Sequence, residues 1–204
     1  MVRRLTDPAS MPGIYSLLGA LVVPRPIGWV STRSIDGVDN LAPHSFYQLV
    51  STNPPIVMIS TMGEKDTARN VKETGEFVVC GSTMELIEKI NLTGIDFESG
   101  ISEFDVAGLT REPSELVAPS RVAESPYALE CRCTDMFEMG NGIVIFGEVV
   151  MIAVDERVMD DRRVMMNELN PVARLGASDW SGLGEIVDVP RMSVADYEAK
   201  YGSP

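Results

Sequence analysis

The sequence predicts a mainly β fold, an antiparallel barrel or sandwich with peripheral helices. Segments with the composition of strands follow one another along most of the 204 residues, and helices are expected only near the start and in the middle. Strands and helices do not alternate regularly, which argues against a doubly wound parallel sheet. The glycine-rich loops G-x-G-x-x-G and G-x-x-x-x-G-K-[ST] are absent, so the two best-known nucleotide-binding loops are missing.

The first third of the chain is expected to form one helix and then three extended segments. Pro12 stands at a plausible first helical position, and the apolar residues after it have helical spacing. Pro24-Arg25-Pro26 ends this helix, β-forming residues follow, and Pro43 is expected to kink the second extended segment. The expected elements are a helix over 12–21, a strand over 27–34, a turn over 35–38, an extended segment over 40–50, a turn over 53–55 and a buried strand over 56–61.

The remaining two thirds are expected to begin with a helix and to contain two long strands. Asp66 or Thr67 is expected to be the N-cap of this helix, and Gly75 is expected to end it. Residues 1–184 are expected to form one domain, and 185–204 a tail or a dimer arm. The other expected elements are a strand over 76–81, an amphipathic helix over 83–92, a loop with short helical turns over 93–120, strands over 127–137 and 143–154 joined by a turn over 139–142, a short strand after Asp160-Asp161, and the segment 169–171.

The charge is strongly negative and unevenly distributed. Seventeen Lys and Arg residues against 30 Asp and Glu residues give a net charge of −13, which argues against nucleic acid as a partner. Residues 1–75 are net +1, whereas residues 76–204 are net −14. If the protein binds an anionic small molecule, its phosphate or carboxylate is therefore expected in the first third of the chain.

Histidine and cysteine usage restricts the chemistry further. His44 is the single histidine, which excludes a metal site built on two or three histidines and leaves one candidate for a histidine-based triad. The three cysteines, Cys80, Cys131 and Cys133, are an odd number without a secretory segment, so we expect reduced packing thiols in a cytoplasmic protein. The apolar stretch 17–23 is too short to span a bilayer. No membrane association is expected.

An anion site is expected where the second helix begins. Lys65, Asp66 and Thr67 stand at that junction, where a Lys ammonium and a Thr hydroxyl adjoin free backbone N–H groups. Ser31, Thr32 and Ser45 could add neutral donors. The junction therefore offers phosphate binding without a glycine-rich loop.

Eight segments, in order and spacing over residues 20–177, resemble the flavin reductase-like family of FMN-binding split β-barrels. Each segment alone is a weak signal, but eight in sequence make a chance similarity improbable. The segments are P-R-P-I-G-W-V-S-T (24–32), N-L-A-P-H-S-F (40–46), N-P-P-I-V-M-I-S (53–60), K-D-T-A-R-N (65–70), S-E-F-D-V-A-G-L-T (102–110), S-P-Y-A-L-E-C (125–131), F-G-E-V-V (146–150) and P-V-A-R-L-G (171–176).

The resemblance implies a six-stranded antiparallel Greek-key split barrel, a homodimer with FMN at or near the subunit interface, and hydride transfer from NADH or NADPH to flavin N5. No metal is implied. Arg174 would reach the site or the dimer interface. The residues implied to line the isoalloxazine ring and ribityl chain are Ser31, Thr32, Ala42, Pro43, His44, Ser45 and Phe46, and those implied at the phosphate end are Lys65, Asp66, Thr67 and Asn70.

Several alternatives stay open at this point. The protein is alternatively a non-catalytic FMN-binding electron carrier, similar to flavoredoxin, that a partner protein reduces. Oxidation of a pyridoxamine-type substrate and haem binding are further split-barrel possibilities. His44 is a possible catalytic residue or only a neighbour of the flavin, and Asp66 is more naturally a helix cap than a ligand contact. Residues 178–204 depart from the resemblance and are compatible with a dimer-embracing arm, a lid or a loose tail.

Overall fold

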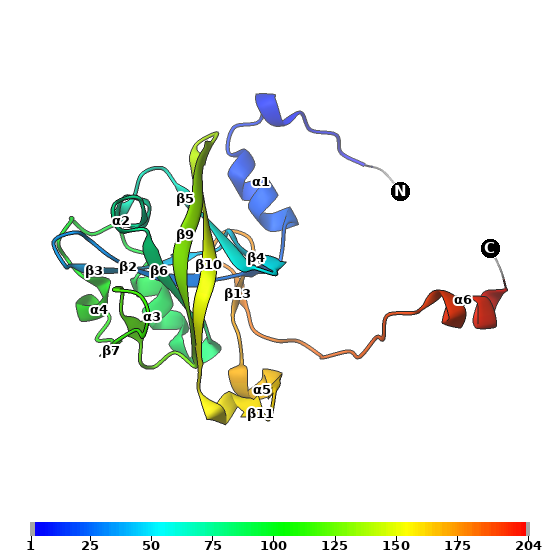
Figure 1. Cartoon of the computed structure of the whole chain (residues 1–204). Helices are drawn as coiled ribbons and strands as arrows, with labels where there is room; N and C mark the ends of the chain where they lie inside the picture. Colours follow the sequence, from blue (N-terminus) through cyan, green and yellow to red (C-terminus); the bar gives the residue numbers. More distant parts are fainter. Residues whose placement is uncertain (1–2, 203–204) are drawn as a thin grey trace.

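A large antiparallel sheet forms the centre of the molecule (Figure 1). The computed structural model describes residues 3–202, so the outermost residues of the two expected parts, 1–2 and 203–204, lie outside it. Within the described chain the sheet has seven strands in the order β3-β2-β6-β9-β10-β5-β4. The mainly β antiparallel class is confirmed, whereas the count of six strands and the closure of a barrel stay predictions. The strands are β2 (Gly28–Arg33), β3 (Asp39–His44), β4 (Tyr47–Thr52), β5 (Pro55–Met62), β6 (Glu76–Cys80), β9 (Tyr127–Met139) and β10 (Gly142–Val154).

The segment expected as one extended stretch over 40–50 forms both edge strands of this sheet. β3 pairs with β2, and β4 pairs with β5, at opposite ends of the strand order. Only Ser45 and Phe46 separate the two strands, so the chain turns at these two residues. The predicted kink at Pro43 is wrong, because Pro43 lies within β3. Because two residues join the two edges, the edges of the sheet approach each other at this corner.

The helices are close to the predicted ones but begin at different residues. α1 (Ile14–Leu21) follows Gly13 in the left-handed region at φ 70°, so Pro12 lies outside the helix that it was expected to begin. α2 (Asp66–Thr74) ends at Gly75, as predicted, because glycine tolerates the φ of 74° found there. The amphipathic helix expected over 83–92 is divided into η2 (Met84–Leu86) and α3 (Ile87–Leu92). α4 (Glu103–Val106) is one of the short helical turns expected within 93–120.

The core has two parts because neighbouring side chains of a strand point to opposite faces. Trp29 packs with Leu41, Ile90 and Phe104 beneath α3 and α4, and its indole N–H donates to Thr93 Oγ1 at 2.8 Å. The next residue, Val30, packs in the other cluster with residues of β5, β6, β9, β10 and α2. Trp29 is therefore a packing residue.

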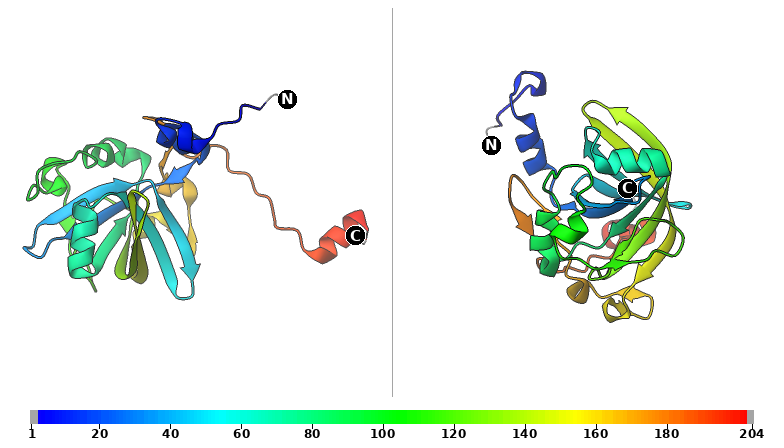
Figure 2. Two further views of the ribbon diagram at one scale, coloured as in Figure 1. Left: turned by 90° about the horizontal axis from the view of Figure 1, so that it is seen from above. Right: turned by 90° about the vertical axis from the view of Figure 1, so that its left-hand side faces the viewer.

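The C-terminal part begins beside the sheet and then leaves it. The strand expected after Asp160-Asp161 is β12, and Pro171 forms an isolated bridge with Thr83. The chain then runs outward to α6 (Val194–Tyr201), as Figures 1 and 2 show. The remaining short elements are η1 (Pro8–Ser10), β1 (Arg25–Pro26), β7 (Arg111–Glu112), β8 (Arg121–Val122), η3 (Glu156–Val158), β11 (Met159–Asp160), β12 (Arg163–Val164), α5 (Met166–Leu169), β13 (Ala173–Arg174) and β14 (Trp180–Ser181).

The division of the chain at residue 184 stays a prediction. None of the helices within residues 3–202 combines the length and the apolarity that a bilayer crossing requires.

Candidate functional site

A cavity of about 400 Å³ opens at the corner where β3 is followed by β4. Strands β3 and β5, the start of α2, the segment after α3, and α1 each contribute to its wall. Its size lies within the range of small-molecule and cofactor pockets. The residues that line it are Tyr15, Asn40, Ala42, Pro43, His44, Ser45, Phe46, Ser60, Thr61, Met62, Lys65, Asp66, Thr67, Thr93, Gly94, Ile95, Asp96, Phe97 and Glu103.

Eight of the twelve residues predicted to bind the cofactor line this one cavity. They come from two separate parts of the sequence, one at the end of β3 and one at the start of α2. Pairing of the strands brings the two parts together. The eight are Ala42, Pro43, His44, Ser45, Phe46, Lys65, Asp66 and Thr67.

Three of the other predicted residues lie behind the cavity wall. Ser31 and Thr32 are fully buried, and Asn70 is 2% exposed. Asn70 donates to Thr32 Oγ1 at 3.0 Å, so these two side chains connect α2 with β2. Ser31 Oγ and Asn70 Oδ1 have no hydrogen-bond partner among the described residues. The predicted contact of these three residues with a cofactor stays a prediction.

Arg174 lies outside the cavity. It is in β13, where it pairs with Arg25 of β1, and its guanidinium lies 4.7 Å from the ring centroid of Trp180. It also donates to the Ala177 carbonyl oxygen. These contacts keep its side chain away from the cavity of its own chain, and its predicted role at the site or at the dimer interface stays a prediction.

A chain of hydrogen bonds extends from the cavity floor into the protein. Asn40 uses both amide hydrogens, one for Thr67 Oγ1 at 3.3 Å and one for Thr32 Oγ1 at 3.4 Å. With Thr67 accepting from Asn40, its own hydroxyl hydrogen is available to His44 Nε2, 3.2 Å away. This direction of the bond corresponds to the tautomer of His44 with the ring hydrogen on Nδ1.

His44 is held in its neutral form. The residue is half-buried and lines the cavity, and the loss of hydration around its ring lowers its pKa to about 4. A hydrogen bond with the Ser60 backbone opposes the shift, and the nearby charge of Lys65 adds to it. At neutral pH the ring therefore carries no charge, and Nε2 is already hydrogen-bonded by Thr67.

The start of α2 provides free donors at the cavity. The N-cap position is Lys65 and not Asp66 or Thr67, and Asp66 is the first helical residue. The Asp66 carboxylate accepts instead from Arg69 Nη2 at 2.5 Å. The first N–H groups of a helix have no partner within it, and the helix dipole makes this end favourable for an anion.

Lys65 is the cation of this cavity, and it already has a partner. Its Nζ lies 2.7 Å from Asp96 Oδ1, with the Lys65 side chain 51% exposed and that of Asp96 76% exposed. An exposed ion pair contributes at most about 1 kcal/mol. An incoming phosphate can therefore compete with Asp96 for the ammonium group.

A buried carboxylate closes another side of the cavity. Glu103 is 6% exposed, and its Oε2 accepts from the Leu41 backbone N–H at 2.9 Å. Burial raises the pKa of Glu103, the Leu41 N–H opposes this, and the negative charge of Asp66 adds to it. Glu103 therefore connects α4 to β3 and lines the cavity.

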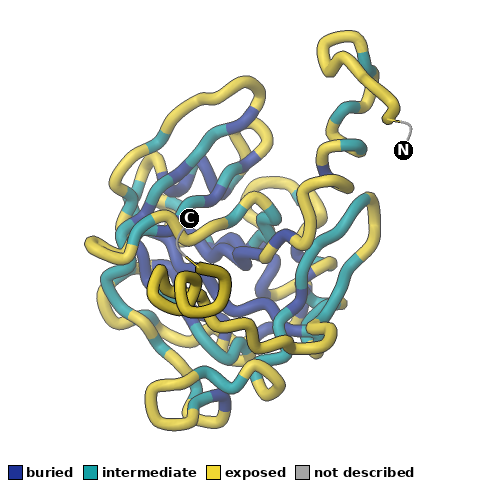
Figure 3. The backbone as a smooth tube through the Cα atoms, turned by 90° about the vertical axis from the view of Figure 1, so that its right-hand side faces the viewer, coloured by how far each residue is buried: buried dark blue, intermediate teal, exposed yellow. Residues whose placement is uncertain are grey.

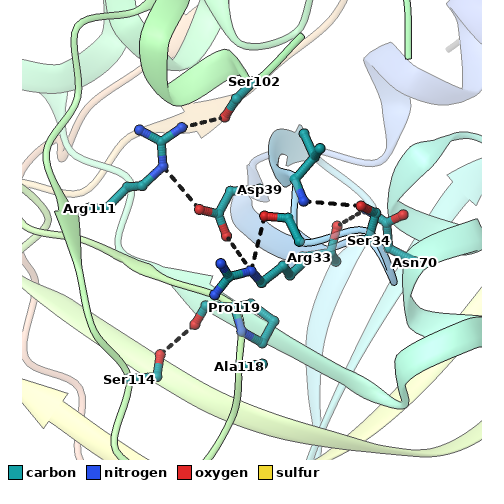
Figure 4. Close-up of polar contacts among 12 residues, drawn as sticks. Arg33, Ser34, Asp39, Asn70, Ser102, Arg111, Ser114, Ala118 and Pro119 are labelled. Atoms are coloured by element: carbon teal, nitrogen blue, oxygen red, sulfur yellow. Dashed lines mark hydrogen bonds and ion pairs between the residues drawn. The ribbon is translucent and has the colours of Figure 1, made fainter. Parts of the chain in front are cut away.

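Arg111 fixes α4 against the same strand. It donates to Asp39 Oδ2 at 3.0 Å and to Ser102 Oγ at 2.8 Å, and its guanidinium lies 5.0 Å from the Phe104 ring centroid. Figure 4 shows Arg111 pointing toward Asp39 and Ser102, with Arg33 on the other side of the Asp39 carboxylate. These contacts connect β7 and α4 to β3 and so position Glu103.

Sequence reasoning gave no role to several residues that line the cavity. Glu103 stands in the segment 102–110, which carried the resemblance but no assigned role, and Asn40 begins the segment 40–46. The ring centroid of Tyr15 lies 6.4 Å from that of Phe46. Nothing in the sequence around Tyr15 indicated that it lines a site. The segment 93–97 was read as part of a loop, because nothing local indicates that it faces the start of α2.

Comparisons with known proteins show which family the chain belongs to. The flavin reductase like domain matches residues 20–168. A protein of Aquifex aeolicus is 41% identical over 169 residues, which cover 80% of this chain and 86% of that protein. Among solved structures, nitrilotriacetate monooxygenase component B from Bacillus cereus superposes with a TM-score of 0.89 at 29% identity, covering 93% of this chain and 100% of that one.

The 2-nitrobenzoate 2-nitroreductase NbaA of Pseudomonas fluorescens superposes with a TM-score of 0.86 at 27% identity, covering 94% of this chain and 98% of that one. The family resemblance read from the sequence is thereby confirmed. The chain belongs to the flavin reductase-like family.

Proposed function

We propose that this protein is an FMN-binding oxidoreductase that takes a hydride from NADH or NADPH at flavin N5. The observation that carries the proposal is the composition of the cavity wall. Aromatic side chains, Tyr15 and Phe46, lie at one part of it, and the start of α2 with Lys65 lies at another. A flavin mononucleotide needs both, because it joins a flat apolar ring to a phosphate.

The residues fit that group in size and in chemistry. The cavity of about 400 Å³ is large enough for a cofactor. Thr67 is 1% exposed, yet its hydroxyl stands between the helix start and His44. A short hydroxyl at that place leaves the first N–H groups of α2 accessible to phosphate oxygens. Ser45 and Ser60 offer further polar atoms along the wall.

When bound, FMN would supply the redox chemistry itself. The chain's own residues then have the tasks of binding, orienting and excluding water. Lys65 and the N–H groups of α2 would hold the phosphate, and Phe46 and Tyr15 would lie against the ring. His44, which is neutral and hydrogen-bonded to Thr67, would present an uncharged imidazole to the flavin ring.

A second candidate is an FMN-binding electron carrier that a partner protein reduces. The observation that favours it is the net charge of −14 over residues 76–204, since an acidic surface accelerates docking of a basic partner. Both candidates use the same cavity. They differ only in whether a nicotinamide reduces the flavin directly.

The assembly and location that accompany the proposal are a homodimer with FMN near the subunit interface, in the cytoplasm. The three cysteines are free thiols, which agrees with a reducing compartment. Nicotinamide and flavin nucleotides are the proposed small-molecule partners.

The test is an anaerobic reduction of the FMN-loaded protein, followed through the visible flavin spectrum. NADH and NADPH are added separately, and dithionite serves as the control for full reduction. The reductase proposal predicts that at least one of the two nicotinamides bleaches the bound flavin. If neither nicotinamide bleaches it while dithionite does, the reductase proposal is wrong and the electron carrier stands.

A further inference from the structure

α1 presents apolar side chains to solvent over most of its surface. Its sequence, I-Y-S-L-L-G-A-L, has polar atoms only on Tyr15 and Ser16, and Gly19 is its single buried residue. Leu18 is 51% exposed, Leu21 is 68% and Val22, which follows the helix, is 63%. A helix that is apolar on nearly all sides is normally buried. We therefore expect other protein atoms to cover this one.

The position of α1 is nevertheless fixed by its own domain. Arg25 is 7% exposed, and its guanidinium donates to three carbonyl oxygens, those of Gly19, Val22 at 2.9 Å and Leu175 at 2.8 Å. No carboxylate within residues 3–202 pairs with it. Gly176 packs so closely on the helix that a Cβ there would lie 2.9 Å from Ala20 Cβ. The apolar surface of α1 is thus held in one orientation.

The C-terminal segment has the complementary character. Every described residue from Leu183 to Gly202 is exposed, as the uninterrupted yellow tube of α6 and the chain leading to it shows (Figure 3). The segment nevertheless carries eight large apolar side chains. They are Leu183, Ile186, Val187, Val189, Met192, Val194, Tyr197 and Tyr201.

We propose that residues 183–201 form an exchanged arm that packs on α1 of a second copy of this chain. The arm leaves the domain on the side where the N-terminal segment also lies and runs away from its own sheet (Figures 1 and 2). Ordering a segment costs conformational entropy, which burial of apolar surface has to offset. In a symmetric dimer, residues 183–201 of each copy would cover the exposed apolar surface of α1 in the other copy.

The exchange bears directly on the cavity. Tyr15 belongs to α1 and also lines the cavity beside Phe46, 37% exposed. An arm seated on α1 would therefore complete the wall of the partner's cavity and reduce the access of water to it. The proposed arm extends the proposed function. It rests on that function only for the statement that a flavin occupies the cavity.

The experiment compares the full chain with a chain that ends at Gly182. Light scattering gives the mass, and hydrogen exchange gives the protection of α1. We expect a dimer for the full chain, and at least a tenfold faster exchange in α1 after truncation, with β9 and β10 unchanged. A monomeric full chain, or α1 exchange that truncation does not alter, would overturn the inference.

Point variants keep the test independent of the truncation. The double variant Val189→Asp, Val194→Asp is expected to reproduce the effect of truncation on α1. Ile35→Asp is the matched control, because Ile35 is an apolar residue, 74% exposed, in the β2–β3 turn. It is expected to change neither mass nor exchange. An equal effect of the control would overturn the assignment of the arm.

Flavin fluorescence in the same samples separates this inference from the proposed function. FMN binding to a full chain that is monomeric would contradict the arm and leave the function intact. A dimer with a protected α1 that binds no FMN would contradict the function and leave the arm intact.

Discussion

Thr67 shows how much of this site depends on single side chains. Its hydroxyl joins His44 to Asn40, and Asn40 in turn joins it to Thr32 behind the wall. The sequence singled out Thr67 as a phosphate donor but did not indicate this second contact, because His44 and Asn40 reach it through strand pairing and not through local spacing. A site residue can be recognised from a motif, whereas its partners require the register of the strands.

The protonation of His44 is the first residue-scale prediction. His44 is the only histidine, so its ring signals in an NMR pH titration of untagged protein are unambiguous. We expect a pKa of about 4, because burial disfavours the charged ring. A pKa near the ordinary 6.5 would show that the ring is hydrated and free.

The same shift has a consequence for stability with a definite sign. Between about pH 6.5 and pH 4, His44 is protonated in the unfolded chain but not in the native protein, so the free energy of unfolding falls as pH falls through this window. We expect His44 to lower the free energy of unfolding by roughly 1–3 kcal/mol between pH 6.5 and pH 4. Urea unfolding of His44→Gln is the control and should lack this contribution. The raised pKa of Glu103 acts in the opposite sense and cancels in the difference, since both proteins carry it.

Lys65 carries the second residue-scale prediction. Lys65→Ala is expected to weaken FMN binding about tenfold, or about 1.4 kcal/mol, and to leave riboflavin binding nearly unchanged, because riboflavin has no phosphate. Lys89→Ala is the control, since the Lys89 ammonium binds the Gly108 carbonyl oxygen outside the cavity. Flavin fluorescence titrations measure all four affinities. An equal loss for FMN and riboflavin would contradict the assignment of Lys65 to the phosphate.

At the scale of elements, the sequence predicted what depends on local pattern. The long hairpin of β9 and β10 was expected from β-forming runs around the Gly-containing turn, and Gly75 was expected to end α2. The division of residues 40–50 into two strands was not expected, because the turn at Ser45 and Phe46 is set by how the two sheet edges meet. Asp66 was expected as a helix cap, but Arg69 competes for its carboxylate.

Gly147 provides a prediction for the sheet. It lies at a register irregularity of β10, where a Cβ would collide with the Phe77 ring and lie 3.1 Å from Cys131 Cβ. Gly147→Ala is therefore expected to destabilise the protein by about 1–3 kcal/mol through overpacking. Glu138→Ala is the control, because Glu138 is an exposed residue of the neighbouring strand β9. Urea unfolding measures both, and equal stabilities would contradict the close packing.

At the scale of the whole molecule, the charge distribution located the site only in part. The expected anion-binding region, residues 1–75, supplies Lys65 and the start of α2. Asp96 and Glu103 belong to the acidic part of the chain, and they also line the cavity. The sequence could not show this, because net charge along a chain does not tell which loops fold back over a site. In the proposed phosphate site, the ammonium group of Lys65 is therefore shared with Asp96.

The central claim is that FMN occupies the cavity at the start of α2, beside His44. An FMN titration of untagged protein, with the His44 ring signals followed by NMR and flavin fluorescence followed in parallel, tests it most directly. We predict micromolar binding, one FMN per chain, with the ring signals shifting on the same curve as the fluorescence. Absence of binding at tens of micromolar, or binding that leaves the His44 signals unmoved, would contradict the claim.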